Sequence, residues 1–149
     1  MNLLLQQKKE LKELEVEIRY PKMTEQISQI VDFIRQYDFV IEGFQGDKFC
    51  QITLDQIYYI ETADRRTFIY LEREVYESRN TILAIETMLK ESTMVRIGKS
   101  TLLNISMLKT VKPYPNHRIL VELLNGEHLI VSRKYISELK ERIRREYGA

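Results

Sequence analysis

The chain has 149 residues, of which 44% are hydrophobic, and a formal net charge of +1 at pH 7. This size allows one core, or two small ones, without disulfides or metal ions, and the single Cys50 excludes an intramolecular disulfide and suits a reducing cytoplasm. The N-terminal leucines are followed at once by dense charge, so the sequence predicts neither a signal peptide nor a membrane-spanning segment.

Charge is distributed unevenly along the chain. Residues 90–149 carry 12 Lys and Arg against 6 Asp and Glu, whereas residues 1–89 carry 11 against 16. Such an asymmetry points to nucleic acid or another anionic surface as a partner. Charge alone leaves open whether the basic residues bind DNA or only keep the surface soluble.

The N-terminal region is expected to hold one strand and one helix. Apolar residues alternate with charged ones over residues 16–20, until Pro21, which predicts a short strand. Thr24 is then a candidate N-cap of a helix that turns Asp32 toward water. The apolar stripe of this helix comprises Ile27, Ile30, Val31 and Ile34.

From Phe39 the apolar period changes to two, which predicts mainly antiparallel β structure with turns at residues 45–47, 62–65 and 72–74. Asn125-Gly126 separates two apolar runs and predicts a hairpin with a two-residue type I′ turn, in which both positions need positive φ.

Two further helices are expected in this β region. One covers residues 81–90, and its predicted inward side chains are Ile82, Ile85, Met88 and Leu89. The other starts at about Arg133, with Ser132 as its cap, and its apolar stripe comprises Ile136, Leu139 and Ile143.

Candidate catalytic and metal-binding groups are scarce. His117 and His128 have no partner at metal-ligand spacing. The run Gly-Lys-Ser at residues 98–100 lacks the second glycine of a phosphate-binding loop, because Thr93 stands at that position. The sequence therefore predicts a protein that is not an enzyme and needs neither a metal ion nor a cofactor.

Basic residues gather instead in the expected turns. Lys and Arg can read guanine in the major groove, while Ser hydroxyls suit phosphate oxygens, so this mixture fits base readout with backbone positioning. The alternative is a dispersed set of solubilising charges. The candidates are Arg65 and Arg66 in one turn, Arg96, Lys99 and Ser100 in another, Lys109 and Lys112 further on, and Ser132, Arg133 and Lys134 at the final helix.

Three segments, in order, resemble the LytTR DNA-binding domain of bacterial transcriptional regulators over roughly residues 44–145. They are IYYIE at residues 57–61, VRIGKSTLLN at residues 95–104, and LNGE at residues 124–127 running into VSRKY at residues 131–135. The resemblance implies an elongated, mostly antiparallel β domain with a few helices. It also implies that loops, not a recognition helix, enter successive major grooves of double-stranded DNA, often as two copies on repeated half-sites.

Carried over by position, the resemblance assigns roles to individual residues. Base contacts are expected from Arg65 or Arg66, from Lys99 and from Lys134. Asn104 is expected to support loop architecture. Backbone contacts are expected from Ser100, Ser132, Arg133, Arg96 and Lys112. The chain departs from the family pattern in two places. At the position before Lys99, many members have histidine, whereas this chain has Gly98. Its first loop is also short.

On this interpretation residues 1–43 form a strand-helix segment and residues 44–149 form the LytTR-type domain. The first segment is too short for the phospho-acceptor receiver of many relatives, so the chain resembles stand-alone LytTR regulators, which are controlled by a partner, often a small membrane protein. With 6 basic and 8 acidic residues and an exposed-looking Leu3-Leu4-Leu5, the segment is expected either to dimerise or dock a partner, or to cap the β domain.

The expected protein is a cytoplasmic transcriptional regulator that is dimeric on DNA. The alternative function is a protein-interaction or anti-regulator β module that uses the basic loops for an acidic partner.

Overall fold

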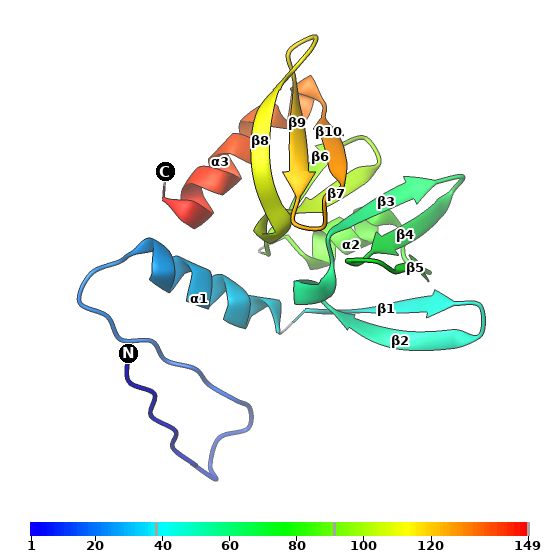
Figure 1. Ribbon diagram of the computed structural model, residues 1–149. Helices are drawn as coiled ribbons and strands as arrows, with labels where there is room; N and C mark the ends of the chain where they lie inside the picture. Colours follow the sequence, from blue (N-terminus) through cyan, green and yellow to red (C-terminus); the bar gives the residue numbers. More distant parts are fainter. Residues whose placement is uncertain (38, 91, 149) are drawn as a thin grey trace.

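The computed structural model describes residues 1–37, 39–90 and 92–148. Two antiparallel sheets form the body of the molecule, one of seven strands in the order β2-β1-β5-β4-β3-β7-β6 and one of three in the order β10-β9-β8 (Figure 1). The mainly antiparallel β fold expected from the period-two pattern is confirmed.

The larger sheet contains β1 (Val40–Gln45), β2 (Lys48–Thr53), β3 (Tyr59–Ala63), β4 (Arg66–Tyr70), β5 (Val75–Ser78), β6 (Met94–Gly98) and β7 (Thr101–Asn104). The smaller sheet contains β8 (Leu108–Tyr114), β9 (Arg118–Leu123) and β10 (His128–Val131). The helices are α1 (Glu25–Gln36), α2 (Ile82–Met88) and α3 (Ile136–Tyr147), and short 3₁₀ turns are η1 (Leu54–Gln56), η2 (Ile105–Met107) and η3 (Arg133–Tyr135).

Two apolar clusters lie on opposite sides of the strand pair β3 and β7. Successive side chains of a strand point to opposite faces, so Leu102 joins one cluster and Leu103 the other. The first cluster lies between the larger sheet and α2, and Ile85 of α2 is fully buried in it. The second lies between β6, the smaller sheet and α3, where Leu139 is fully buried. The strands that join the two clusters are therefore buried on both faces.

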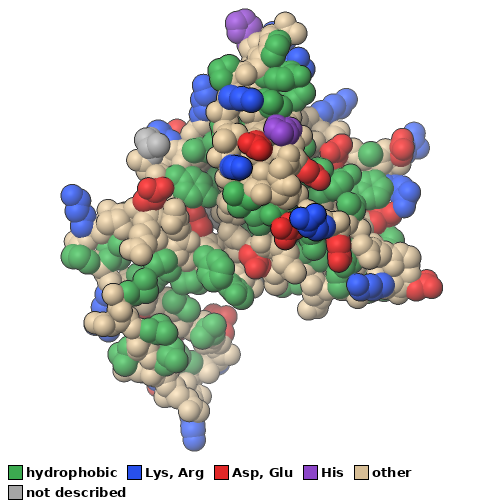
Figure 2. Space-filling view, viewed as in Figure 1, with side chains coloured by type: hydrophobic (Ala, Val, Ile, Leu, Met, Phe, Trp, Pro, Cys, Tyr) green, Lys and Arg blue, Asp and Glu red, His purple; other side chains and the backbone are tan. Residues whose placement is uncertain are grey.

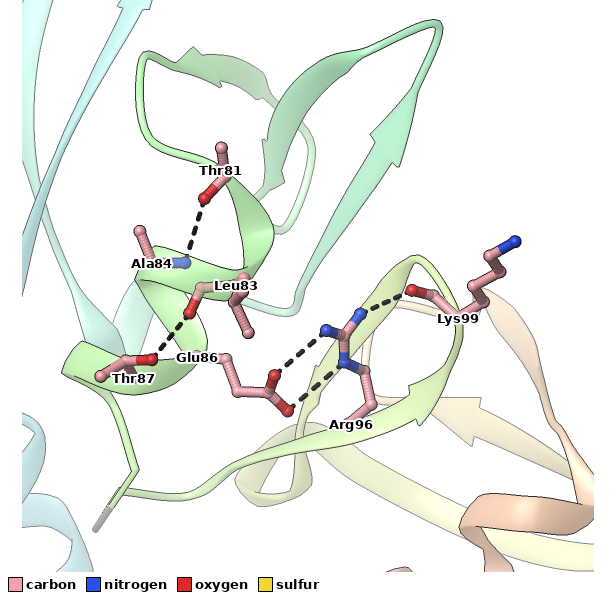
Figure 3. Close-up of polar contacts among 7 residues, drawn as sticks. All are labelled: Thr81, Leu83, Ala84, Glu86, Thr87, Arg96 and Lys99. Carbon is pink, nitrogen blue, oxygen red and sulfur yellow. Dashed lines mark hydrogen bonds and ion pairs between the residues drawn. The ribbon is translucent and has the colours of Figure 1, made fainter.

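The predicted cap at Thr24 is confirmed, and Thr81 caps the second helix in the same way, although the sequence pattern predicted no cap there. The Oγ1 atoms of Thr24 and Thr81 accept backbone hydrogen bonds from Ile27 and Ala84, at 3.4 and 3.1 Å (the second is drawn in Figure 3). Met88 was expected to face inward, but it is half exposed, because α2 ends there and Leu89 fills the core instead.

The start of the last helix differs from the prediction. Residues after Ser132 form the 3₁₀ turn η3, and the α-helix begins only at Ile136. The Ser132 side chain makes no capping hydrogen bond and is exposed. The apolar stripe itself is as expected, since Leu139 is buried and Ile143 packs against the second cluster.

The strand predicted over residues 16–20 is wrong. Residues 1–24 form an irregular segment that extends away from the sheets (Figure 1), and Val16 keeps 56% of its surface exposed. A strand needs a neighbour for its backbone hydrogen bonds, and no described strand pairs with this segment. The alternation of apolar and charged residues over residues 16–20 was therefore not enough to form a strand without a neighbouring strand to pair with.

The hairpin between β9 and β10 is confirmed, but its turn is not type I′. Only Gly126 has positive φ, at 92°, and its N–H donates to the Leu123 carbonyl at 2.9 Å. The Asn125 side chain accepts from the Glu127 N–H at 3.1 Å and donates to the Glu72 carbonyl at 3.0 Å. Both polar groups of the Asn125 side chain are therefore used in hydrogen bonds. The turn is longer than the predicted two-residue turn, and only one of its residues, Gly126, needs the left-handed conformation.

Asp32 was expected to face water, but it is only 5% exposed, because α1 packs against α3. A cavity of about 550 Å³ lies between these helices, lined in part by Asp32, Arg142 and Glu146. Burial, and next the neighbouring Glu146 carboxyl, raise the pKa of Asp32 to about 7, although Arg35 and Arg142 oppose the shift.

Replacing Asp32 by Asn is expected to change how stability depends on pH. The folded chain holds the Asp32 proton up to about pH 7, whereas the ordinary pKa is 3.8, so this group makes folding less favourable as pH rises between those values. Urea unfolding of Asp32→Asn should show a weaker loss of stability between pH 5 and pH 8 and a higher midpoint than wild type at pH 8. Glu25→Gln, on the exposed first turn of α1, is the control. Parallel pH profiles for wild type and Asp32→Asn would contradict the assignment.

Candidate nucleic-acid interface

Two of the expected loops lie side by side at one edge of the larger sheet. We call residues 64–65 the first loop and residues 99–100 the second loop. Strand β3 ends where its antiparallel neighbour β7 begins, with Glu61 opposite Thr101. The Thr62 N–H donates to the Ser100 carbonyl at 2.9 Å, so one backbone hydrogen bond joins the strand that leads into the first loop to the second loop.

The third loop, residues 132–135, comes from the smaller sheet and reaches the same edge. The Ser132 N–H donates to the Ile97 carbonyl at 3.0 Å, just before the second loop. A Cβ placed on Gly98 would lie 3.8 Å from the Ser132 hydroxyl, so the third loop lies within contact distance of the start of the second. The structure therefore brings together three loops that are more than 30 residues apart from one to the next.

The first loop is a type I′ turn with Asp64 and Arg65 at its tip. Their φ values are 52° and 63°, and the pair Ala63 and Arg66 closes the ladder below them. Arg65 is exposed and makes no ion pair with any residue in the described ranges. Arg66 is already engaged, because its guanidinium pairs with Glu77 and lies 5.3 Å from the ring centre of Phe68.

The second loop is shaped by Arg96, whose side chain is only 15% exposed (Figure 3). Its Nε and Nη2 atoms donate to the Glu86 carboxylate at 3.3 and 3.1 Å, and its Nη1 donates to the Lys99 carbonyl at 2.6 Å. The Lys99 side chain extends away from these contacts, as Figure 3 shows. Arg96 thus ties α2 to the loop and leaves the Lys99 ammonium free to reach outward.

Asn104 ends β7 and no part of its side chain is exposed. Its Nδ2 donates to the carbonyls of Leu54 and Ile57 at 3.2 and 2.8 Å. Its Oδ1 accepts from the Thr93 hydroxyl at 2.6 Å and from the Ser106 N–H at 3.1 Å. The side chain therefore joins three separate chain segments at the opposite end of β7 from the second loop.

The third loop presents Ser132, Arg133 and Lys134, all exposed. The Lys134 ammonium lies 5.7 Å from the ring centre of its neighbour Tyr135. Lys112 lies apart from the three loops, on β8, which is two strands away from β10. The structure thus brings together all the base-contact candidates and the Ser100, Ser132 and Arg133 backbone candidates, but not Lys112.

The three loops expose the cations Arg65, Lys99, Arg133 and Lys134, together with the Ser132 hydroxyl. Lys and Arg side chains project from the right-hand side of the molecule in Figure 2, interspersed with Asp and Glu side chains, where the β3–β4 and β1–β2 turns lie in Figure 1. Within the described ranges, no group of three or more His, Cys, Asp or Glu is placed to hold a metal ion. Exposed cations and hydroxyls on rigid turns can bind phosphates and reach base edges.

Sequence reasoning missed two residues of this edge. Glu86 holds Arg96 from a position ten residues earlier, on a different element, so no local spacing signalled the pair. Arg79 follows β5 at the same edge of the sheet, but it stands outside the three turns to which the resemblance pointed.

The fold and the loop edge define a mainly β domain that presents cations from neighbouring turns. A family model for the "LytTr DNA-binding domain" matches residues 47–144, and the chain belongs to this family, which confirms the resemblance found from the sequence. The family is named for DNA binding.

Similar proteins agree with this assignment. The chain is 28% identical to the Sensory transduction protein LytT of Enterococcus faecalis over 97 residues, covering 65% of this chain and 40% of that protein. It is 26% identical over 89 residues to the Transcriptional regulatory protein YpdB of Escherichia coli, covering 59% of this chain and 36% of that protein. The match thus spans about two fifths of the length of these relatives.

A solved structure has the same fold. It is described as the LytTr DNA-binding domain of a putative methyl-accepting/DNA response regulator from Bacillus cereus, with a TM-score of 0.66 and 21% identity. The alignment covers 70% of this chain and 95% of that one. Among the described residues, no helix combines the length and apolar character that a bilayer crossing requires.

A double-mutant cycle on Glu86 and Arg96 tests how firmly the second loop is held. Because this pair is partly buried, urea unfolding of Glu86→Gln, Arg96→Met and the double variant should give a coupling of about 1 kcal/mol. The exposed pair Glu141 and Arg144 on α3 is the control and should couple by less than about 0.5 kcal/mol. Equal couplings would mean that Arg96 does not anchor the loop.

Proposed function

We propose that this chain is a sequence-specific transcriptional regulator that inserts its first, second and third loops into successive major grooves of repeated DNA half-sites. The observation that carries the proposal is the adjacency of the loops, which two backbone hydrogen bonds hold at one edge, from Thr62 to Ser100 and from Ser132 to Ile97. Rigid loops lose little entropy on binding, so the edge is suited to a defined docking geometry.

The loops differ in what they can contribute. Arg65, Lys99 and Lys134 are exposed at the tips and would read bases, with Arg66 the weaker candidate in the first loop because Glu77 holds its guanidinium. Backbone phosphates would be bound by Ser100, Ser132 and Arg133.

Three of the remaining residues take different roles in this proposal. Arg96 would position the second loop instead of binding phosphate, because Glu86 and the Lys99 carbonyl occupy its donors. Asn104 would support the loops from inside the domain. Lys112 would contact the DNA backbone at a flank of the interface, since β8 is the far strand of the smaller sheet.

Two copies are proposed to bind together through the N-terminal segment. Two aromatic side chains are exposed on this segment: Phe33 in α1 is 54% exposed, and Tyr37, the C-cap of α1, is 58% exposed. Their ring centres lie 5.2 Å apart in an edge-to-face pair. Leu3, Leu4 and Leu5 are also exposed. Apolar surface of this kind is typical of interaction sites. A regulatory protein, including one in a membrane, would compete for the same surface.

Loop variants test the base contacts. The target duplex is obtained by selecting bound sequences from a random pool, in which repeated half-sites spaced by about one or two helical turns are expected. On that duplex, Lys99→Ala and Lys134→Ala should each lose on the order of 1–3 kcal/mol and relax the preference at one base pair, because each removes a base contact. Arg133→Ala should weaken specific and random DNA alike. Equal losses on both DNAs for all three variants would contradict the base assignments.

Salt dependence separates this function from the alternative, in which the basic loops bind an acidic protein. Neutralising about six phosphates predicts that affinity for duplex DNA falls by about 10³-fold from low to moderate salt. An unenriched pool with only weak retention would favour the protein partner.

Self-association is tested with Phe33→Ser combined with Tyr37→Ser. Since both side chains are exposed, the domain should stay folded while dimerisation, measured by sedimentation equilibrium, weakens by tenfold or more, roughly the loss of two buried aromatic rings. Leu83→Ser, an exposed apolar side chain on α2, is the matched control. A variant that dimerises like wild type, or a wild-type chain that stays monomeric with and without DNA, would contradict the proposed surface.

A further inference from the structure

The loop edge of the larger sheet continues beyond the first loop. Strand β5 pairs with β4 in antiparallel register, with Thr67 opposite Ser78, so β5 ends beside the start of β4. Arg79 follows directly after β5. Its place is therefore the same edge as the first loop, one strand further from the second and third loops.

The Arg79 guanidinium is held by two aromatic rings. Its carbon Cζ lies 4.8 Å from the ring centre of Phe49 and 5.6 Å from that of Phe44, and these rings are themselves 5.7 Å apart. Phe44 and Phe49 face one another across the β1 and β2 ladder. Contacts between a guanidinium and ring faces restrict the side chain but leave its N–H donors free at the rim.

Arg79 differs in this respect from two other arginines of the larger sheet, Arg66 on β4 and Arg96 on β6. Arg66 and Arg96 are each paired with a carboxylate, Glu77 and Glu86. Arg79 is exposed, and within the described ranges it makes neither an ion pair nor a side-chain hydrogen bond. A preoriented guanidinium with free donors is suited to a phosphate, which can accept two parallel hydrogen bonds.

The spacing agrees with a contact outside the groove. Three strand steps separate β5 from β7, which carries the second loop, or about 14 Å at ~4.8 Å for each step. The major groove is about 12 Å wide. If the first and second loops share the groove of one half-site, Arg79, which lies one strand step beyond the first loop, comes to the backbone that borders the groove on that side.

We propose that Arg79 is a fourth nucleic-acid contact, which binds a backbone phosphate and extends the DNA interface along the larger sheet to the Phe44 and Phe49 pair. This inference rests on the proposed function, because it needs the first and second loops on DNA. Arg79 adds affinity without sequence preference, since a phosphate contact carries no base information.

The test compares Arg79→Ala with Arg73→Ala on the selected duplex, extended by about one helical turn on each side. Arg73 is an exposed arginine in the turn at the opposite end of the same β4 and β5 hairpin, so it controls for the loss of one positive charge. Fluorescence anisotropy should show that Arg79→Ala weakens binding about 3- to 10-fold on specific and random duplexes alike. The slope of log affinity against log salt should fall by about 1 for Arg79→Ala, while Arg73→Ala changes neither quantity.

Two further variants separate binding from packing. Arg79→Lys keeps the charge and should recover most of the affinity, and Phe49→Leu, which removes one supporting ring, should weaken binding less than Arg79→Ala does. If Arg79→Ala lowers the urea midpoint, Arg79→Gln, which keeps a polar side chain over the rings, replaces it in the comparison.

If the affinity and the salt slope of Arg79→Ala equal those of Arg73→Ala, the inference is overturned and Arg79 only covers the two aromatic rings. A wild-type chain without steep salt-dependent binding to duplex DNA would overturn the proposed function as well.

Discussion

The buried amide of Asn104 is the contact on which the loop edge depends. It lies at the end of β7, between the two apolar clusters, and joins the segments around Leu54, Ile57 and Thr93. The Asn104 N–H also donates to the Tyr58 carbonyl at 3.0 Å, at the start of β3. Each buried polar group left unpaired would cost about 1–3 kcal/mol, so the junction strongly favours a single alignment of β3 on β7. That alignment places the first loop beside the second.

The basic residues of the loop edge fall into two groups, those that stabilise the turns and those that are exposed at their tips. Arg66 and Arg96 form ion pairs with Glu77 and Glu86 of neighbouring elements, and these pairs restrict the motion of the turns. Arg65 and Lys99 stand exposed at the tips and form no ion pair with any residue that the structure describes. A turn that is braced in this way can hold a cation in a fixed place without a recognition helix, which is the physical basis for docking through loops.

The N-terminal helix is coupled to the same edge through α3. Helix α3 follows the third loop after the short turn η3, and α1 packs against it around Asp32 and Arg142. Arg142 also donates to the Ser92 carbonyl, at the entry to β6 and the second loop. The opposite side of α1, with Phe33 and Tyr37, remains open. One helix therefore connects an exposed apolar surface to the framework of two loops.

Local patterns in the sequence determined the helix cap at Thr24, the period-two strands, the β9 and β10 hairpin and the turns that carry the basic residues, because these depend on neighbours within a few positions. Only the tertiary structure decided which cations are paired, that Asp32 is buried, that residues 16–20 form no strand and that Arg79 joins the edge. Those outcomes depend on which elements meet, and partners such as Glu86 or α3 are chosen by packing across the whole chain, which no local spacing records.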